Sequence, residues 1–304
     1  MIDNERICVM ALTMTEGLGN AKTRVLLEHF GTATEIFTVR HRLWEMVCGG
    51  GGNYLPMQIA RQMEEGMRRA EREVRFMEQH HIHLYAITDE DYPYRLRECF
   101  DPPVVCYYRG NANLNASKVV SVVGTRRATE CGLRHAEDLV KGIAAACPGT
   151  LIVSGLAYGI DICAHRQALR SGLPTIGVMA HGQDDLYPRI HRETALQMLD
   201  RGGLLTDYPS ETIIRGENFL KRNRLIAGLA DAVVVVESPE RSGALSTAAH
   251  AFAYNRDVFA FPGRVEDDHT VGCNRLIREL KAKLITSSID LIDSMMWNDR
   301  PIPN

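Results

Sequence analysis

VVSVVGTRR (residues 119–127) and LIVSGLAYGID (residues 151–161) each begin with a short apolar run and continue through glycine into polar residues. A run of this length suits a strand that is buried on both faces, and glycine after a strand permits a tight turn into a helix. The two stretches therefore predict strand, loop and helix units of a parallel sheet.

The same alternation continues to the C-terminus. Strands are expected at residues 119–123, 151–154, 175–179, 204–206, 232–236, 258–261 and 284–286. Helices are expected at residues 130–146, 160–171, 192–200, 222–227, 244–254 and 274–281. Because the strands are apolar on both sides, helices should cover both faces of the sheet. We therefore expect an α/β fold over residues 79–304, a Rossmann-like, doubly wound and mostly parallel sheet.

Residues 1–78 follow a helical pattern and predict a small all-helical domain. The turn GLGN (residues 17–20) separates two apolar segments. Helix-hairpin-helix units use such a turn to point backbone amides at a DNA phosphate, but the same turn also serves as a plain connection. The glycines at 49–52 predict a flexible loop, and residues 61–79, which mix both charges, predict a solvated helix.

Composition limits the kinds of partner. The formal net charge of the 304 residues is −3, which argues against a protein that coats nucleic acid indiscriminately, so a site for a polyanion must be local. The 8 cysteines form no C-x-x-C pair and are typical of reduced cytosolic thiols. With no secretory signal and no apolar run near the ~20 residues of a membrane span, we expect a cytoplasmic protein.

The loops after the expected strands share one chemistry. Glycine, hydroxyl groups and arginine follow the strands in GTRR (124–127), GLAYGID (155–161), SGALST (242–247) and PGR (262–264). The carboxyl ends of parallel strands meet at one edge of the sheet, where ligands bind. Together these loops predict a site for several phosphates, although glycine after a strand also serves tight turns.

FLKRNRLIAGL (residues 219–229) places three cations and an amide where an apolar helix is expected to begin. A helix N-terminus and arginine side chains both favour phosphate, and asparagine can bond sugar or base. Phe219 suits base stacking, at ~1 to 3 kcal/mol, or packing in the core. The alternative for the arginines is pairing with surface carboxylates.

Common cofactor and metal motifs are absent from the sequence. There is no G-x-G-x-x-G fingerprint and no P-loop, so we expect no nucleotide cofactor. Ser154 and Ser242 lack the G-x-S-x-G elbow of a nucleophilic serine. His80, His81 and His83 are interpreted as surface residues, so no metal is expected. His165 is expected to be buried and hydrogen-bonded.

A set of motifs follows one another along the chain, namely VGTR (123–126), SGLAYGID (154–161), AH (164–165), LYP (186–188), RNRLIAGL (222–229), SGALSTA (242–248), FPG (261–263) and GCNRLI (272–277). Through these motifs the chain resembles the DNA-processing protein A family (DprA, also called Smf). The resemblance covers nearly the whole chain, and the helical region resembles the family's N-terminal helix-hairpin-helix or SAM-like domain.

The resemblance implies a single-stranded DNA-binding protein without catalysis that protects incoming DNA during natural transformation, loads the RecA recombinase and forms a homodimer. From the loops and the resemblance, the residues expected to bind DNA are Gly124, Arg126, Arg127, Gly155, Arg215, Phe219, Lys221, Arg222, Asn223, Arg224, Ser242 and Gly243. Many members have a basic residue where this chain has Tyr158, and Pro and Arg where it has Leu220 and Lys221. Many also continue into a C-terminal winged-helix module, which is not expected in this sequence.

Two other function classes stay open. A Rossmann-like hydrolase of small nucleotides would need a carboxylate near Ser242, for which Glu237 is the candidate. A pure adaptor that captures RecA would lack salt-dependent binding to DNA.

Overall fold

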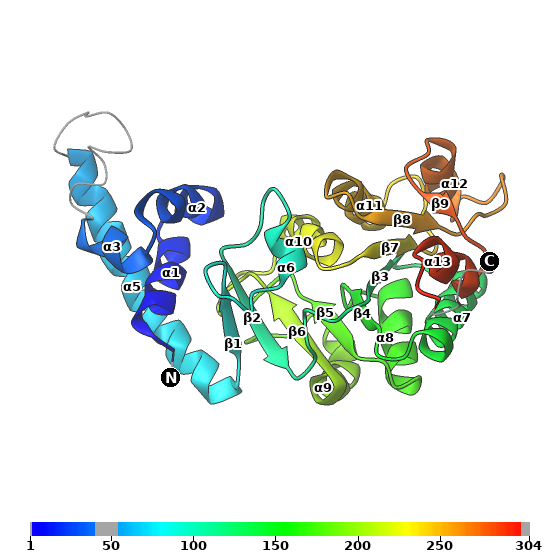
Figure 1. Cartoon of the computed structure of the whole chain (residues 1–304), viewed down its shortest axis with the longest axis horizontal. Helices are drawn as coiled ribbons and strands as arrows, with labels where there is room; N and C mark the ends of the chain where they lie inside the picture. The colour runs from blue at the N-terminus through cyan, green and yellow to red at the C-terminus, as the bar shows by residue number, and fades with distance from the viewer. Residues whose placement is uncertain (1, 40–53, 299–304) are drawn as a thin grey trace, which may run out of the picture. The chain divides into compact units, whose positions relative to one another are not determined.

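The structure, a computed structural model, describes residues 2–39 and 54–298 (Figure 1), so the loop expected at 49–52 lies outside the described residues. The chain divides into two compact units. The first comprises residues 1–92 and 101–108, and the second comprises residues 93–100 and 109–304. The assignment of residues 1–78 as a helix-hairpin-helix or SAM-like domain stays a prediction.

The first unit is built on helices α1 (Asn4–Met14), α2 (Gly19–Phe30), α3 (Ala33–Thr38) and α5 (Tyr54–His80). The expected turn at 17–20 is confirmed, because α1 ends before it and Gly17 and Gly19 both have positive φ angles. Helix α1 packs on α5 at Gly66, where a Cβ atom would lie 2.7 Å from the carbonyl oxygen of Ala11. Only glycine allows the two helices to approach so closely.

A two-stranded antiparallel ladder of β1 (His83–Ala86) and β2 (Val105–Gly110) completes this unit, and the sequence pattern did not predict it. Leu84, Val104 and Val105 join the apolar cluster formed by the helices. Their burial explains why a strand of only four residues persists, since a fully buried Val or Leu contributes ~1.5 to 3 kcal/mol.

The second unit contains a parallel sheet in the order β6-β5-β4-β3-β7-β8-β9. These strands are β3 (Val119–Val123), β4 (Leu151–Ser154), β5 (Thr175–Val178), β6 (Gly202–Thr206), β7 (Ala232–Val235), β8 (Asp257–Ala260) and β9 (Lys283–Leu284). The helical elements are α6 (Tyr94–Arg97), α7 (Glu130–Ala146), α8 (Ile160–Arg170), η1 (Arg189–His191), α9 (Arg192–Arg201), α10 (Gly216–Gly228), α11 (Gly243–Ala253), α12 (Val271–Arg278) and α13 (Ser288–Ser294). The expected doubly wound α/β fold is confirmed.

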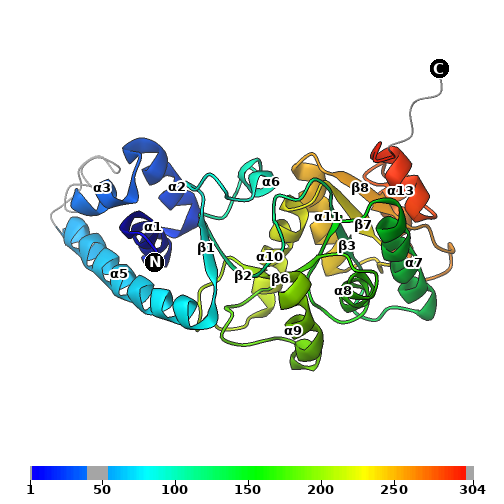
Figure 2. The same ribbon diagram turned by 60° about the horizontal axis from the view of Figure 1, so that its bottom comes forward.

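Strand β3 shows why the sheet is covered on both faces. Val120 and Val122 pack in one apolar cluster with Leu139 of α7. Ser121 points to the opposite face and donates from its hydroxyl to the carbonyl oxygen of Ile226 on α10, at 2.6 Å. Figures 1 and 2 show α7 and α8 on one side of the sheet and α10 and α11 on the other.

Several element boundaries differ from expectation, among them those of α12, β8 and β9, and two starts have a clear physical reason. The helix expected at 222–227 begins six residues earlier, at Gly216, so the prediction that Arg222 and Asn223 stand at a helix head is wrong. Strand β6 begins at Gly202 rather than at 204. Residue 202 must be glycine, because a Cβ there would meet the carbonyl oxygen of Thr175 on β5. Because glycine has a low propensity for strands, the sequence pattern did not indicate that the strand begins here. Among residues 2–39 and 54–298, no helix is both long and apolar enough to cross a bilayer.

Candidate nucleic-acid interface

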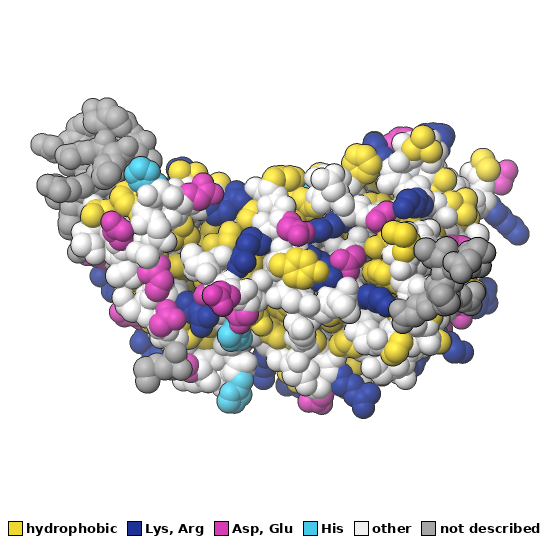
Figure 3. All heavy atoms as spheres, in the orientation of Figure 1, with side chains coloured by type: hydrophobic (Ala, Val, Ile, Leu, Met, Phe, Trp, Pro, Cys, Tyr) yellow, Lys and Arg dark blue, Asp and Glu magenta, His cyan; other side chains and the backbone are white. Residues whose placement is uncertain are grey.

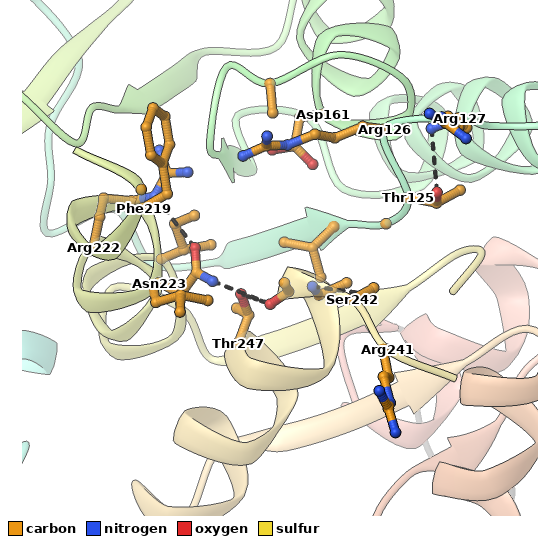
Figure 4. A pocket seen from close by; sticks show the side chains of 18 of the residues that line it. Thr125, Arg126, Arg127, Asp161, Phe219, Arg222, Asn223, Arg241, Ser242 and Thr247 are labelled. Atoms are coloured by element: carbon orange, nitrogen blue, oxygen red, sulfur yellow. Dashed lines mark hydrogen bonds between the residues drawn. The ribbon is translucent and has the colours of Figure 1, made fainter. Parts of the chain in front are cut away.

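A cavity of about 700 Å³ opens where the winding of the sheet reverses. Strand β3 leads through α7 to β4 on one side, whereas its neighbour β7 leads through α11 to β8 on the other. Such a switch point leaves a crevice between two diverging loops at the carboxyl ends of the strands. The loops are 124–129 and 236–242, and α10 closes a further side (Figure 4). We call this cavity the switch-point pocket.

Basic side chains dominate the charge of the switch-point pocket. Its lining includes one carboxylate, Asp161, and five arginines, namely Arg126, Arg127, Arg215, Arg222 and Arg241. All but Arg222 are exposed. Figure 3 shows basic and acidic side chains interspersed over the face that it draws. The excess of positive charge is therefore local, as the net charge of −3 requires.

Arg222 differs from the other arginines because only 4% of it is exposed. Its Nη1 donates to the carbonyl oxygen of Gly155, at 2.9 Å, and to that of Val178. Burial lowers the pKa of Arg222 to about 10, against the opposing effect of Asp161. The same burial raises the pKa of Asp161, and Arg222 partly offsets it. Arg222 thus links α10 to the ends of β4 and β5, and its guanidinium is already hydrogen-bonded within the protein.

Asn223 and Ser242 shape the opposite wall. Ser242 is the N-cap of α11, and its hydroxyl accepts from the backbone N–H of Ala244, at 3.2 Å. The side-chain amide of Asn223 donates to the carbonyl oxygen of Gly243, at 3.1 Å. These bonds hold the first turn of α11 against α10, so that the positive end of the α11 dipole lines the pocket.

Phe219 and Tyr187 are the aromatic residues of the pocket lining. The guanidinium carbon of Arg126 lies 5.3 Å from the centroid of the Phe219 ring, and that of Arg222 lies 5.9 Å from it. Figure 4 shows Arg126 extending from the loop after β3 toward Phe219. Cation–π attraction favours this arrangement and orients the exposed Arg126 across the pocket.

The structure brings most of the expected site residues together. Those that line the switch-point pocket are Gly124, Arg126, Arg127, Arg215, Phe219, Arg222, Asn223, Ser242 and Gly243. Gly155, Lys221 and Arg224 are not among its lining residues. Arg224 forms an ion pair with Asp207, and Lys221 lies 3.7 Å from Glu217. The structure thus shows Arg224 paired with a carboxylate, which was the alternative left open for the arginines by the sequence.

Gly155 contributes by its small size. A Cβ there would lie 2.7 Å from both Arg222 Nη2 and Asp161 Oδ2. Its N–H donates to Asp161 Oδ2, at 3.2 Å. Glycine is thus required beside the buried Arg222 and Asp161, which line the pocket, although Gly155 itself does not.

Sequence reasoning missed Arg241, Asp161 and Tyr187 as pocket residues. Arg241 directly precedes the Ser242 loop, so extending that loop by one residue would have found it. Tyr187 belongs to the LYP motif, whose place beside α10 depends on tertiary structure.

Glu237, the carboxylate considered for hydrolysis, does not line the switch-point pocket. Its Oε2 accepts from the backbone N–H of Thr129, at 2.8 Å, and its Oε1 from the Thr129 hydroxyl, at 2.6 Å. Glu237 is 3% exposed and stabilises the start of α7. The hydrolase alternative therefore loses its candidate residue.

The histidines behave as expected. His80, His81 and His83 are exposed, and His165 is fully buried with its Nδ1 2.7 Å from Thr175 Oγ1. Burial lowers the pKa of His165 to about 3, so its imidazole is neutral. The expected burial and hydrogen bonding of His165 are confirmed.

Comparison with known proteins assigns the family. The sequence profile of the DNA recombination-mediator protein A family matches residues 83–296. The chain belongs to this family. The DNA processing protein DprA of Streptococcus pneumoniae is 39% identical over 209 residues, which cover 68% of this chain and 72% of the relative. Protein Smf of Synechocystis sp. is 34% identical over 313 residues, covering 97% of this chain and 74% of the relative.

Solved structures of the family agree in fold. The crystal structure of DprA from Streptococcus pneumoniae superposes with a TM-score of 0.82 at 31% identity, covering 96% of this chain and 98% of that chain. DprA from Helicobacter pylori, whose structure concerns its binding mode for single-stranded DNA, gives a TM-score of 0.63 at 28% identity. That match covers 71% of this chain and 96% of the other. The resemblance of the motifs to the DprA/Smf family is thereby confirmed.

Proposed function

We propose that the protein is a non-enzymatic, cytoplasmic binder of single-stranded DNA that uses the switch-point pocket to hold the strand. The observation that carries this proposal is the set of four exposed arginines, Arg126, Arg127, Arg215 and Arg241, around the N-terminus of α11. Arginine and a helix N-terminus both favour phosphate. A related protein of Helicobacter pylori that binds single-stranded DNA supports the same ligand here.

The cellular role that we propose is protection of incoming DNA during natural transformation and loading of RecA onto it, by a homodimer. Membership of a recombination-mediator family supports this role. A pocket that holds only a short part of the strand fits it, because the rest of the strand stays available to the recombinase.

The test compares fluorescently labelled oligo-dT with a duplex of the same length by fluorescence anisotropy. Arg126→Glu should weaken the binding of oligo-dT at least about tenfold, since it replaces an attraction by a repulsion at a phosphate site. Arg134→Glu is the matched control, because Arg134 is an exposed residue of α7 outside the pocket lining. Equal affinity of both variants and the wild type would contradict the proposal that the switch-point pocket binds the strand.

RecA loading is tested separately by filament formation on the same strand with a competing single-strand-binding protein present. The wild type should accelerate filament formation, and Arg126→Glu should not. Acceleration by both proteins, with no salt-dependent DNA binding by either, would favour the pure adaptor instead.

A further inference from the structure

Tyr187 is an exposed aromatic residue at the rim of the switch-point pocket. It lies between β5 and η1, and 45% of it is exposed. Its backbone N–H donates to Nε2 of His181, at 3.2 Å. His181 is buried, which lowers its pKa, and its Nδ1 lies 2.8 Å from the carbonyl oxygen of Gly182. A neutral imidazole with its proton on Nδ1 satisfies both contacts, so the backbone of Tyr187 is held in place.

The ring of Tyr187 contacts the ring of Phe219. Their centroids are 5.6 Å apart and their planes are inclined by 64°, in the edge-to-face arrangement that aromatic pairs prefer. Phe219 also has the guanidinium groups of Arg126 and Arg222 against it. A base that stacked on Phe219 would compete with those two cations, whereas Tyr187 presents more open surface.

We propose that Tyr187 is the residue on which one base of the strand stacks, and that Phe219 is a positioning residue that orients Tyr187 and Arg126. This inference rests on the proposed function. The arginines and the α11 N-terminus take phosphate, and the adjacent base extends to the rim where Tyr187 lies. Stacking needs a free base face, which a single strand offers and a duplex does not. Tyr187 therefore determines the preference for single strands.

The experiment measures the affinity of the full chain for three probes of equal length by fluorescence anisotropy. The probes are oligo-dT, an abasic strand that carries the same phosphates without bases, and a duplex. The wild type should bind oligo-dT about tenfold more tightly than the abasic strand. Tyr187→Leu should remove this difference and leave the affinity for the abasic strand unchanged, and Tyr187→Phe should keep it.

Tyr94→Leu is the matched control. Tyr94 is 42% exposed, belongs to α6 and is not among the residues that line the pocket. The Tyr94→Leu variant should bind all three probes with the affinity of the wild type. Phe219→Leu should weaken the binding of both oligo-dT and the abasic strand, because the substitution removes the ring that orients Arg126 as well as Tyr187.

Two results would overturn the inference while leaving strand binding in place. One is equal affinity of the wild type for oligo-dT and the abasic strand. The other is loss of the base dependence in Phe219→Leu but not in Tyr187→Leu, which would make Phe219 the stacking residue. If the wild type bound neither strand, the proposed function itself would fall.

Discussion

Arg222 of α10 donates a hydrogen bond to the carbonyl oxygen of Gly155, at 2.9 Å, and so connects the middle of a helix to the loop after β4. The same guanidinium reaches the carbonyl oxygen of Val178 at the end of β5. Two adjacent strands therefore depend on one buried side chain. Arg222 is therefore a structural arginine of the pocket, whereas the other arginines of the lining are exposed.

Replacing Arg222 should destabilise the fold, whereas replacing Arg126 should not. Arg222→Met leaves two buried carbonyl oxygens without this donor and Asp161 without its nearby cation, which costs about 2 to 4 kcal/mol. Arg126 is exposed, so Arg126→Met should leave the free energy of unfolding within about 0.5 kcal/mol of the wild type. Urea denaturation measures both values. Equal stability of the two variants would contradict the structural role of Arg222.

The salt dependence of DNA binding should distinguish pocket arginines from the neighbouring cations. Each phosphate contact to a single strand contributes about −0.7 to the slope of log affinity against log salt. Arg241→Gln should therefore reduce the steepness of the slope by about 0.7. Lys221→Gln should leave the slope unchanged, because Lys221 lies beside Glu217 outside the pocket lining. The slope is measured with oligo-dT at several salt concentrations, and the reverse order of effects would argue against the pocket.

The alternation of apolar runs and glycine loops was sufficient to predict the sheet. Strands such as β3 are buried on both faces, so their composition alone identifies them. The ladder of β1 and β2 escaped prediction because its short strands are stabilised by packing against α1 and α5. The start of α10 was also missed, since Gly216 is a weak helix former.

The candidate site was partly predictable for a related reason. Gly124, Ser242 and Gly243 lie at strand and helix ends, positions that a sequence pattern reveals. The burial of Arg222 and the pairing of Arg224 with Asp207 depend on contacts across the fold. The pattern of cations in residues 221–224 does not distinguish an arginine that binds phosphate from an arginine that stabilises the fold.

Glu237 should stabilise α7 rather than act on nucleotides. Its carboxylate accepts two hydrogen bonds from Thr129, the N-cap of α7, where negative charge is favoured by the helix dipole. Glu237→Gln should lower the free energy of unfolding by about 1 to 2 kcal/mol. The exposed Glu240 offers the control Glu240→Gln, which should be neutral.

The same pair of variants tests the hydrolase alternative. Nucleoside monophosphates incubated with the wild type should show no release of free base or ribose phosphate by chromatography. Release that disappears in Glu237→Gln and persists in Glu240→Gln would restore Glu237 as a catalytic candidate.

Acid should destabilise the second unit through His165. Burial lowers the pKa of this imidazole from 6.5 to about 3, so between these pH values the unfolded chain binds a proton that the folded chain does not. The contribution of His165 to stability is therefore complete above pH 6.5 and is lost as the pH falls toward 3. The slope should reach about 1.4 kcal/mol per pH unit from this group. His165→Gln, which does not titrate, should flatten the stability profile in that window, and His269→Gln, at an exposed position, should not. Urea denaturation from pH 7 to pH 4 measures the profiles, and an unchanged slope in His165→Gln would show that other groups determine the acid sensitivity.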